Sequence, residues 1–413
     1  MPTKHTAMLV ILDGLGDRAC KDLKGVTPLQ AAKTPTFDKL ALEGQTGLMD
    51  VIGPGITPGS DAAHLALFGY DPIATYPGRG PLEALGAGLA SKPGDVAFRA
   101  NFATVDTELR VIDRRAGRDF TNEEHRALEE ALAGIEIDGV KVHFTATSQH
   151  RGAVVFEGPG LSGEVTDTDP HETGEIILNS KALTSEAQKT AKIVNSLTKI
   201  AHERLKDIRV NKNRIERGLP AANIILLRGP GQHKKMPTLS ERYGIKSAAL
   251  AGGSLYIGTA KYVGMEHVKV KGQTGTIDTN FEGIAERAIE CVQGDYDYVF
   301  IHVKATDNAS HDGNAQEKVL AIERTDMMVQ KIIDAVGDKL VIAVSGDHTT
   351  PIEIGEHTCD PVPVLLWSSF IRPDDVRAFS EFDCAHGVLK MIIGQDLMPL
   401  LLGYAGHIPK LGA

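Results

Sequence analysis

Three aspartates that each follow a short apolar run could help to hold divalent metal ions. Carboxylate oxygens suit Mn²⁺ or Mg²⁺, and imidazole nitrogens nearby would also admit Zn²⁺ or Co²⁺. The spacing therefore predicts a metal site if the three runs lie side by side. The runs and the aspartates that follow them are residues 7–12 with Asp13, residues 299–303 with Asp307, and residues 340–344 with Asp347.

Histidines accompany two of these aspartates. His311 lies four residues after Asp307, about one helical turn, and His348 is adjacent to Asp347. His357 follows nine residues later, before a proline-containing segment. Taken singly, such an aspartate could be a helix cap and such a histidine a hydrogen-bonded surface group. Together, three carboxylates and three imidazoles are enough to share between two ions.

Ser60 could turn a metal site into a reaction centre. The glycine- and proline-containing segment 55–59 would deliver it to the start of a helix, where backbone N–H groups favour anions such as phosphate. A serine there is often only a cap. Beside two divalent ions, however, its hydroxyl would lose its proton readily and attack a phosphoryl group. His64, one turn later, is predicted to be structural or to support a ligand.

The three apolar runs must be neighbours for this chemistry to occur. Their β-branched composition, with helical patterns between them, indicates parallel strands buried on both faces of an α/β sheet. Ligand sites in such sheets lie beyond the carboxyl ends of the strands. Since the site residues come from the two ends of the chain, we expect a discontinuous metal-binding domain of residues 1–75 and 236–413, with residues 76–235 as a smaller inserted α/β domain.

The chain resembles the alkaline phosphatase superfamily, and within it the archaeal type of 2,3-bisphosphoglycerate-independent phosphoglycerate mutase. The resemblance runs along most of the chain, and Ser310 departs from it where glycine is expected. It implies that Ser60 is phosphorylated and binds one metal with Asp13, Asp347 and His348. Asp307, His311 and His357 would bind the other. The matching segments are residues 12–17 (LDGLGD), 34–40 (TPTFDKL), 59–64 (GSDAAH), 78–84 (GRGPLEA), 113–118 (DRRAGR), 302–307 (HVKATD) and 346–351 (GDHTTP).

Several basic residues are candidates for holding a substrate that bears phosphate and carboxylate groups. Arginine offers a planar pair of donors that matches both groups, although exposed arginines at strand ends are commonly only solvated. The inserted domain is also predicted to contain strands at 96–105, 141–146, 152–156 and 223–227. A capping box at 185–188 predicts the start of a long helix there. The candidate substrate residues are Arg114, Arg115, Arg118, Arg151 and Arg228, with Arg79, Lys261 and Lys304 nearer the metal-binding domain.

Composition excludes other classes of protein. A formal charge of -10 and 5% aromatic residues argue against a nucleic-acid partner. No apolar stretch approaches the roughly 18 residues of a membrane span, and the N-terminal run is too short for a signal peptide. Four separated cysteines favour reduced thiols in the cytoplasm, and Cys359, although close to His357, is interpreted as a small buried residue. No particular oligomeric state is predicted.

The resemblance predicts the interconversion of 3-phosphoglycerate and 2-phosphoglycerate, in glycolysis and gluconeogenesis, through phosphorylated Ser60 and without 2,3-bisphosphoglycerate. The inserted domain would retain glycerate and exclude water during the transfer. Asp13, Asp61 or a metal-bound hydroxide are alternative proton acceptors. Two rival functions are a metal-dependent phosphatase or other phosphoryl transferase of the same superfamily, and a non-catalytic metal- or phosphate-binding protein.

Overall fold

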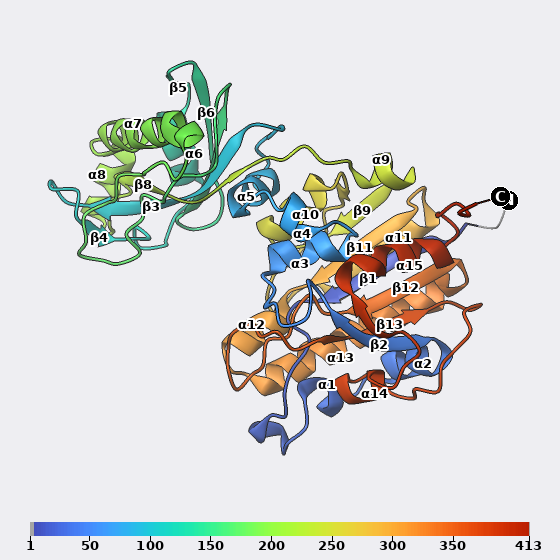
Figure 1. The fold of residues 1–413 in the computed structure, drawn as a ribbon. Helices are drawn as coiled ribbons and strands as arrows, with labels where there is room; N and C mark the ends of the chain where they lie inside the picture. The colour runs from blue at the N-terminus through green and yellow to red at the C-terminus, as the bar shows by residue number, and fades with distance from the viewer. Residues whose placement is uncertain (1–3, 413) are drawn as a thin grey trace. The chain divides into compact units, whose positions relative to one another are not determined.

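The computed structural model describes residues 4–412, which form two compact units (Figure 1). The first unit ends at Tyr76 and resumes at Pro237, and the second unit is Pro77–Met236. No helix among the described residues is long and apolar enough to cross a membrane.

The first unit contains an eight-stranded sheet in the order β10-β9-β11-β1-β12-β13-β2-β14. The pairs from β10 to β12 are parallel, and only β13 runs against both of its neighbours. Every residue of β1, β11 and β12 is buried, which confirms the prediction of parallel strands covered on both faces. The strands are β1 (Thr6–Leu12), β2 (Gln45–Asp50), β9 (Ser247–Leu250), β10 (Glu266–His267), β11 (Tyr298–Val303), β12 (Leu340–Ser345), β13 (Val362–Trp367) and β14 (Lys390–Ile393).

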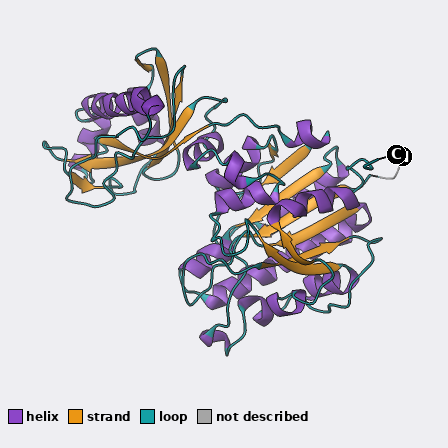
Figure 2. Cartoon of the chain, in the orientation of Figure 1, coloured by secondary structure: helices purple, strands orange, loops and turns teal. Residues whose placement is uncertain are grey.

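Helices lie on both faces of this sheet and complete a three-layer α/β/α arrangement (Figure 2). One face packs on α2, α11 and α13, and the opposite face contacts α3, α10 and α15. The helices are α1 (Pro28–Ala31), α2 (Pro35–Glu43), α3 (Ser60–Leu67), α4 (Pro72–Thr75), α9 (Leu239–Tyr243), α10 (Ser254–Tyr262), α11 (Phe281–Gln293), α12 (Ala305–His311), α13 (Ala315–Val336), α14 (Glu381–Cys384) and α15 (Gly394–Tyr404), with 3-10 turns η1 (Lys21–Leu23) and η3 (Gly337–Lys339).

The second unit is built on a six-stranded antiparallel sheet in the order β4-β3-β7-β6-β5, with β8 paired to β3. Helices α6 and α7 pack their apolar faces on one side of it, and α5 packs on the other side. Its elements are α5 (Arg79–Gly86), β3 (Val96–Val105), β4 (Val111–Asp113), α6 (Asn122–Leu132), β5 (Ile135–Ile137), β6 (Val140–Ala146), β7 (Arg151–Glu157), η2 (Ser185–Ala187), α7 (Gln188–Leu205), α8 (Arg209–Glu216) and β8 (Ile224–Gln232).

The predicted capping box at 185–188 is wrong, although the long helix exists. The Ser185 hydroxyl bonds the Glu186 carboxylate at 2.8 Å instead of capping, and residues 185–187 form a 3-10 turn. Helix α7 begins at Gln188 with no side-chain cap at Ala187. Ser185 already lies inside the 3-10 turn, so it is not at the position from which a side chain caps a helix.

The expectation that Cys359 is buried is also wrong. The residue is exposed, because it lies in the loop between β12 and β13 and not in an element of the core. The other three cysteines, Cys20, Cys291 and Cys384, are buried, and all four are free thiols.

Candidate active site

Asp13 and Asp347 lie at the ends of neighbouring strands β1 and β12 and face each other in the interior. Their ligand atoms and that of His348 all lie within 4.8 Å of one another, and all three residues are buried. The backbone N–H of Gly14 donates to Asp347 Oδ1 at 3.0 Å. Asp13 Oδ1 and Asp347 Oδ2 make no hydrogen bond within residues 4–412. Buried carboxylate oxygens without a donor are expected where a cation completes the site.

A second group of ligand atoms surrounds Asp307, in the first turn of α12 just after β11. Asp307, His348 and His357 again bring one ligand atom each within 4.8 Å of the others. His357 Nε2 lies 3.7 Å from Asp307 Oδ1. His311 lies outside that triplet, but its Nε2 is 3.4 Å from Asp307 Oδ1, one turn along the same helix. The two groups therefore meet at His348.

The three histidines share a hydrogen-bonding pattern that prepares one ring nitrogen for a metal. His311 and His357 donate from Nδ1 to the carbonyls of Gly355 and Pro58, at 2.7 and 2.8 Å. His348 Nδ1 bonds Thr350 Oγ1 at 2.9 Å. These Nδ1 bonds leave Nε2, on the side of the carboxylates, as the nitrogen that each ring could offer to a metal. Metal-ligating histidines are commonly oriented in this way.

Ser60 is the first residue of α3, and the helix cap is Gly59. The serine side chain makes no cap hydrogen bond, so the interpretation of Ser60 as a cap is excluded. Its Oγ instead lies 3.1 Å from His348 Nε2, beside the Asp13 group. His64 is fully buried and donates from Nδ1 to the Ser60 carbonyl at 2.6 Å. Burial lowers the pKa of His64 to about 3, so this imidazole is neutral and supports the turn that presents Ser60.

The pKa values of the carboxylates in the Asp13 group indicate that a bound cation would stabilise their ionised forms. Burial, together with the charge of Asp13, raises the pKa of Asp347 to about 8. Burial also opposes ionisation of Asp13, but Lys304 and neighbouring histidines lower its pKa well below the ordinary value. The Lys304 ammonium donates to Asp13 Oδ2 at 3.0 Å and to Asp307 Oδ2 at 2.5 Å. Ionisation of both Asp13 and Asp347 is thus unfavourable in the protein alone, and a divalent ion beside them would stabilise both charges.

The sequence did not identify two residues that contact Asp13 as part of the site. Tyr256 donates its hydroxyl to Asp13 Oδ2 at 2.5 Å and stacks on His302, with ring centroids 3.6 Å apart. His302 Nε2 lies 3.3 Å from the same carboxylate oxygen. A histidine inside the otherwise apolar strand 298–303 was a usable signal for His302. Tyr256 gave no comparable signal because tyrosine in a helix is ordinary packing.

Five of the predicted arginines line one cavity of about 340 Å³ in the second unit. Arg115, Arg118 and Arg151 have no ion pair or side-chain hydrogen bond to any residue the structure describes. They therefore remain available to an anion. Sequence reasoning missed several residues of this cavity, among them Arg99, which projects from the strand 96–105 and was masked by its apolar neighbours. The lining residues are Arg99, Asn101, Arg114, Arg115, Arg118, His150, Arg151, His171 and Arg228.

One buried carboxylate, Asp169, pairs with two arginines of this basic cavity. Arg114 makes a bidentate pair with Asp169, at 3.0 Å from Nε and 2.8 Å from Nη2, and the Asp169 side chain is fully buried. Arg228 Nη1 lies 3.7 Å from the same carboxylate. Burial and the charges of Arg151 and Arg118 lower the pKa of His150 to about 4, so it adds no charge at neutral pH. The cavity keeps a strong excess of positive charge.

The remaining predicted substrate residues lie elsewhere. Arg79 begins α5 in the second unit and pairs with Glu83, at 3.3 Å from Nε, without lining the arginine cavity. Lys261 is exposed in the last turn of α10. Lys304 contacts the carboxylates of the metal-ligand groups, as described above.

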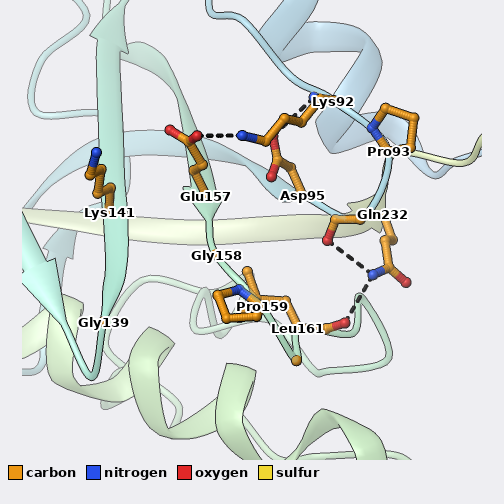
Figure 3. A pocket seen from close by; sticks show the side chains of 12 residues that line it. Lys92, Pro93, Asp95, Gly139, Lys141, Glu157, Gly158, Pro159, Leu161 and Gln232 are labelled. Carbon is orange, nitrogen blue, oxygen red and sulfur yellow. Dashed lines mark hydrogen bonds and ion pairs between the residues drawn. The ribbon is translucent and has the colours of Figure 1, made fainter.

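A second cavity in the same unit, of about 480 Å³, is chemically different (Figure 3). Its Glu157 carboxylate is neutralised by Lys92 at 2.5 Å and contacts His143 at 2.9 Å. The Gln232 amide donates to the carbonyls of Gly94 and Leu161, at 3.1 and 2.9 Å. Because these polar groups satisfy one another, the arginine cavity is the stronger candidate for an anionic substrate.

The first unit has a three-layer α/β/α fold with a mainly parallel sheet, and a nucleophile candidate lies beside two groups of metal-ligand atoms. Comparison with known proteins narrows this class. The family model for 2,3-bisphosphoglycerate-independent phosphoglycerate mutase matches residues 41–211. A curated relative of that name from Ignicoccus hospitalis is 48% identical over 98% of this chain and 99% of its own length.

Three further similar proteins also match nearly the whole chain. One from Methanocaldococcus jannaschii is 48% identical over 99% of this chain and all of its own. A solved structure from Pyrococcus horikoshii is 36% identical with a TM-score of 0.84, and each chain is fully covered. The cofactor-independent phosphoglycerate mutase structure from Thermoplasma acidophilum is 34% identical, with a TM-score of 0.76 over 98% of this chain and all of its own. This chain belongs to the family of 2,3-bisphosphoglycerate-independent phosphoglycerate mutases.

Proposed function

We propose that this protein interconverts 3-phosphoglycerate and 2-phosphoglycerate through a phosphoserine at Ser60, without 2,3-bisphosphoglycerate. The reaction is supported by full-length relatives that carry this name. The observation that carries the residue assignment is the position of Ser60 Oγ, 3.1 Å from His348 Nε2 and beside two buried carboxylates that each have one oxygen without a hydrogen-bond donor. This reaction belongs to glycolysis and gluconeogenesis, and the unpaired state of all four cysteines fits a reducing cytoplasm.

Two divalent ions, of Mn²⁺, Mg²⁺, Zn²⁺ or Co²⁺, suit the donor set. We assign Asp13, Asp347 and His348 to one ion, because their ligand atoms converge and two of the carboxylate oxygens lack a hydrogen-bond donor, and we add Ser60 because its Oγ lies 3.1 Å from His348 Nε2. We assign Asp307, His311 and His357 to the other, because each ring directs Nε2 at the Asp307 carboxylate. When bound, such ions favour the ionised serine hydroxyl and neutralise phosphoryl oxygens.

The bond changes are two successive transfers. Ser60 Oγ forms a bond to phosphorus while the bond from phosphorus to the C3 oxygen of 3-phosphoglycerate breaks, and that oxygen takes up a proton. The C2 hydroxyl of the same glycerate then loses its proton and attacks phosphoserine, which frees Ser60. His64 serves this cycle indirectly, because its bond to the Ser60 carbonyl fixes the turn that presents the hydroxyl.

A mutase must keep glycerate bound between the two transfers, because otherwise water takes the phosphoryl group. We assign this retention to the arginine cavity of the second unit. Arg115, Arg118 and Arg151 carry guanidinium groups with no protein partner within residues 4–412, and such groups match carboxylate and phosphate oxygens. A phosphatase of the same superfamily would not need this cavity, which favours the mutase over its closest rival.

A coupled assay tests the proposal directly. Purified protein with Mn²⁺ and 3-phosphoglycerate is assayed through enolase, in parallel with free phosphate, with and without added 2,3-bisphosphoglycerate. We expect 2-phosphoglycerate to form at the same rate in both conditions, with little phosphate released. Phosphate as the dominant product would favour the phosphatase, and an absolute requirement for 2,3-bisphosphoglycerate would contradict the proposal.

A further inference from the structure

Lys318 is a charged residue in the interior of the first unit. It lies near the start of helix α13, and its side chain has no exposed surface. The ammonium donates to the carbonyl of Gly16 at 3.2 Å, to Asp17 Oδ2 at 2.8 Å and to the carbonyl of Thr350 at 3.1 Å. An ammonium has three protons, so these three acceptors satisfy it completely.

The three acceptors belong to the two loops that carry candidate metal ligands. Gly16 and Asp17 follow Asp13 by three and four residues, at the end of β1. Thr350 follows His348 by two residues, after β12. The loops also touch directly, since the Thr350 N–H donates to the Gly16 carbonyl at 3.1 Å. Lys318 therefore ties both loops to a third element, the 22-residue helix α13.

Thr350 connects the hydrogen bonds of Lys318 to the candidate metal ligands themselves. Its hydroxyl donates to Asp307 Oδ1 at 3.1 Å and hydrogen-bonds His348 Nδ1 at 2.9 Å. The carbonyl of the same residue accepts from Lys318. A shift of Thr350 would thus move His348, which belongs to both groups of ligand atoms, together with the contact to Asp307.

A cation at this position opposes a tendency of the site to open. Asp13 and Asp347 are buried carboxylates on the two loops, and when both ionise to bind a metal ion their like charges repel each other. A metal ion removes the repulsion only after it has bound. Lys318 does not contact either carboxylate, so it leaves their oxygens available while it holds the backbone behind them.

We propose that Lys318 is a positioning residue, an internal ammonium group that holds the β1 and β12 loops at the separation that divalent metal ions require. The inference rests on the proposed function in that it takes Asp13, Asp307, Asp347 and His348 as metal ligands. It predicts a specific effect on metal affinity, whereas a residue that only stabilises the fold would change the melting temperature without changing the affinity of the folded protein.

The experiment measures Mn²⁺ binding by the electron paramagnetic resonance signal of free Mn²⁺, with folding followed by circular dichroism. Lys318→Met removes the ammonium and keeps a chain of similar length. Because that change leaves the buried Asp17 carboxylate without its counter-ion, the double variant Lys318→Met with Asp17→Asn is made as well. Lys331→Met is the matched control, since Lys331 lies on the same helix but is partly exposed and bonds Glu282 and Glu286.

We expect both Lys318 variants to fold and to bind Mn²⁺ at least tenfold more weakly than the wild type, with the control unchanged. At saturating Mn²⁺ the KM for 3-phosphoglycerate should remain near the wild-type value. A folded variant, single or double, with wild-type Mn²⁺ affinity overturns the inference. Failure of both variants to fold also overturns it, because Lys318 would then support the whole unit. A wild type that binds no Mn²⁺ would instead refute the proposed metal site.

Discussion

Replacing single arginines of the cavity in the second unit should convert part of the mutase activity into phosphatase activity. Arg118 and Arg151 line the cavity without a protein partner among residues 4–412, so a substrate anion is the natural acceptor for their donors. Removing one charge-assisted hydrogen bond to a bound anion costs about 1.5 to 3 kcal/mol, or roughly ten- to a hundredfold in rate. Since Ser60 is untouched, transfer to the serine continues while glycerate escapes and water takes its place.

Arg114 should behave differently because it already holds Asp169 in a bidentate pair. Arg114→Ala removes a candidate substrate-binding group and leaves the fully buried Asp169 carboxylate with one backbone donor, the His171 N–H at 2.9 Å on Oδ1, and with Arg228 Nη1 3.7 Å from Oδ2. An unsatisfied buried acceptor costs on the order of 1 to 3 kcal/mol of stability. Arg114→Ala should therefore lower the melting temperature, whereas Arg118→Ala and Arg151→Ala should leave it unchanged.

The assay follows 2-phosphoglycerate through enolase and free phosphate in parallel, for Arg114→Ala, Arg115→Ala, Arg118→Ala and Arg151→Ala. Arg209→Ala is the matched control, because Arg209 is exposed on the same unit and does not line the cavity. The ratio of phosphate to 2-phosphoglycerate should rise in the cavity variants and stay at the wild-type value in the control. Wild-type rates and ratios in every cavity variant would refute the assignment, and the groups that bind substrate would then be sought at Arg79, Lys261 and Lys304.

Two further predictions concern metal and pH. Chelation should abolish turnover. Added Mn²⁺ should restore turnover and raise the melting temperature, because it neutralises Asp13 and Asp347. Full activity in protein that elemental analysis shows to be metal-free would contradict this prediction. The pKa of His64 is near 3 in the folded protein and about 6.5 when unfolded, so the unfolded state binds more protons between these values. Its contribution to stability is complete above about pH 6.5 and is lost as pH falls, at up to about 1.4 kcal/mol per pH unit. Urea unfolding of His64→Gln at pH 4 to 7 should show a smaller slope with pH than the wild type; an equal slope would mean that His64 is not buried in its neutral form.

The sequence predicted the central strands well because their pattern has one physical meaning. Strands β1, β11 and β12 are apolar at nearly every position, which suits only a strand covered on both faces. Parallel neighbours also place their carboxyl ends at one edge, so the meeting of Asp13 and Asp347 followed from topology. The sequence did not predict that His348 belongs to both ligand groups, because the path of the loop after β12 depends on contacts of Thr350 and Lys318.

Side chains that act through tertiary interactions left weaker signals. Tyr256 reaches Asp13 from α10, more than 200 residues away along the chain. The pattern around Ser185 matched a capping box, but a local bond to Glu186 competed with the backbone. The arginines were recognised by their type, whereas their common cavity depends on how the loops after β4 and β6 fold. Patterns of burial are thus readable from sequence, while polar interactions between distant segments are not.

The central claim, that Ser60 carries the phosphoryl group, is tested most directly by trapping the phosphoenzyme. Protein incubated with Mn²⁺ and 3-phosphoglycerate labelled with ³²P is quenched in acid, digested, and examined by mass spectrometry beside Ser60→Ala. We predict one phosphorylated peptide that contains Ser60 in the wild type. Ser60→Ala should fold normally, carry no label and form no 2-phosphoglycerate. Label at another residue, or normal turnover by Ser60→Ala, would contradict the account.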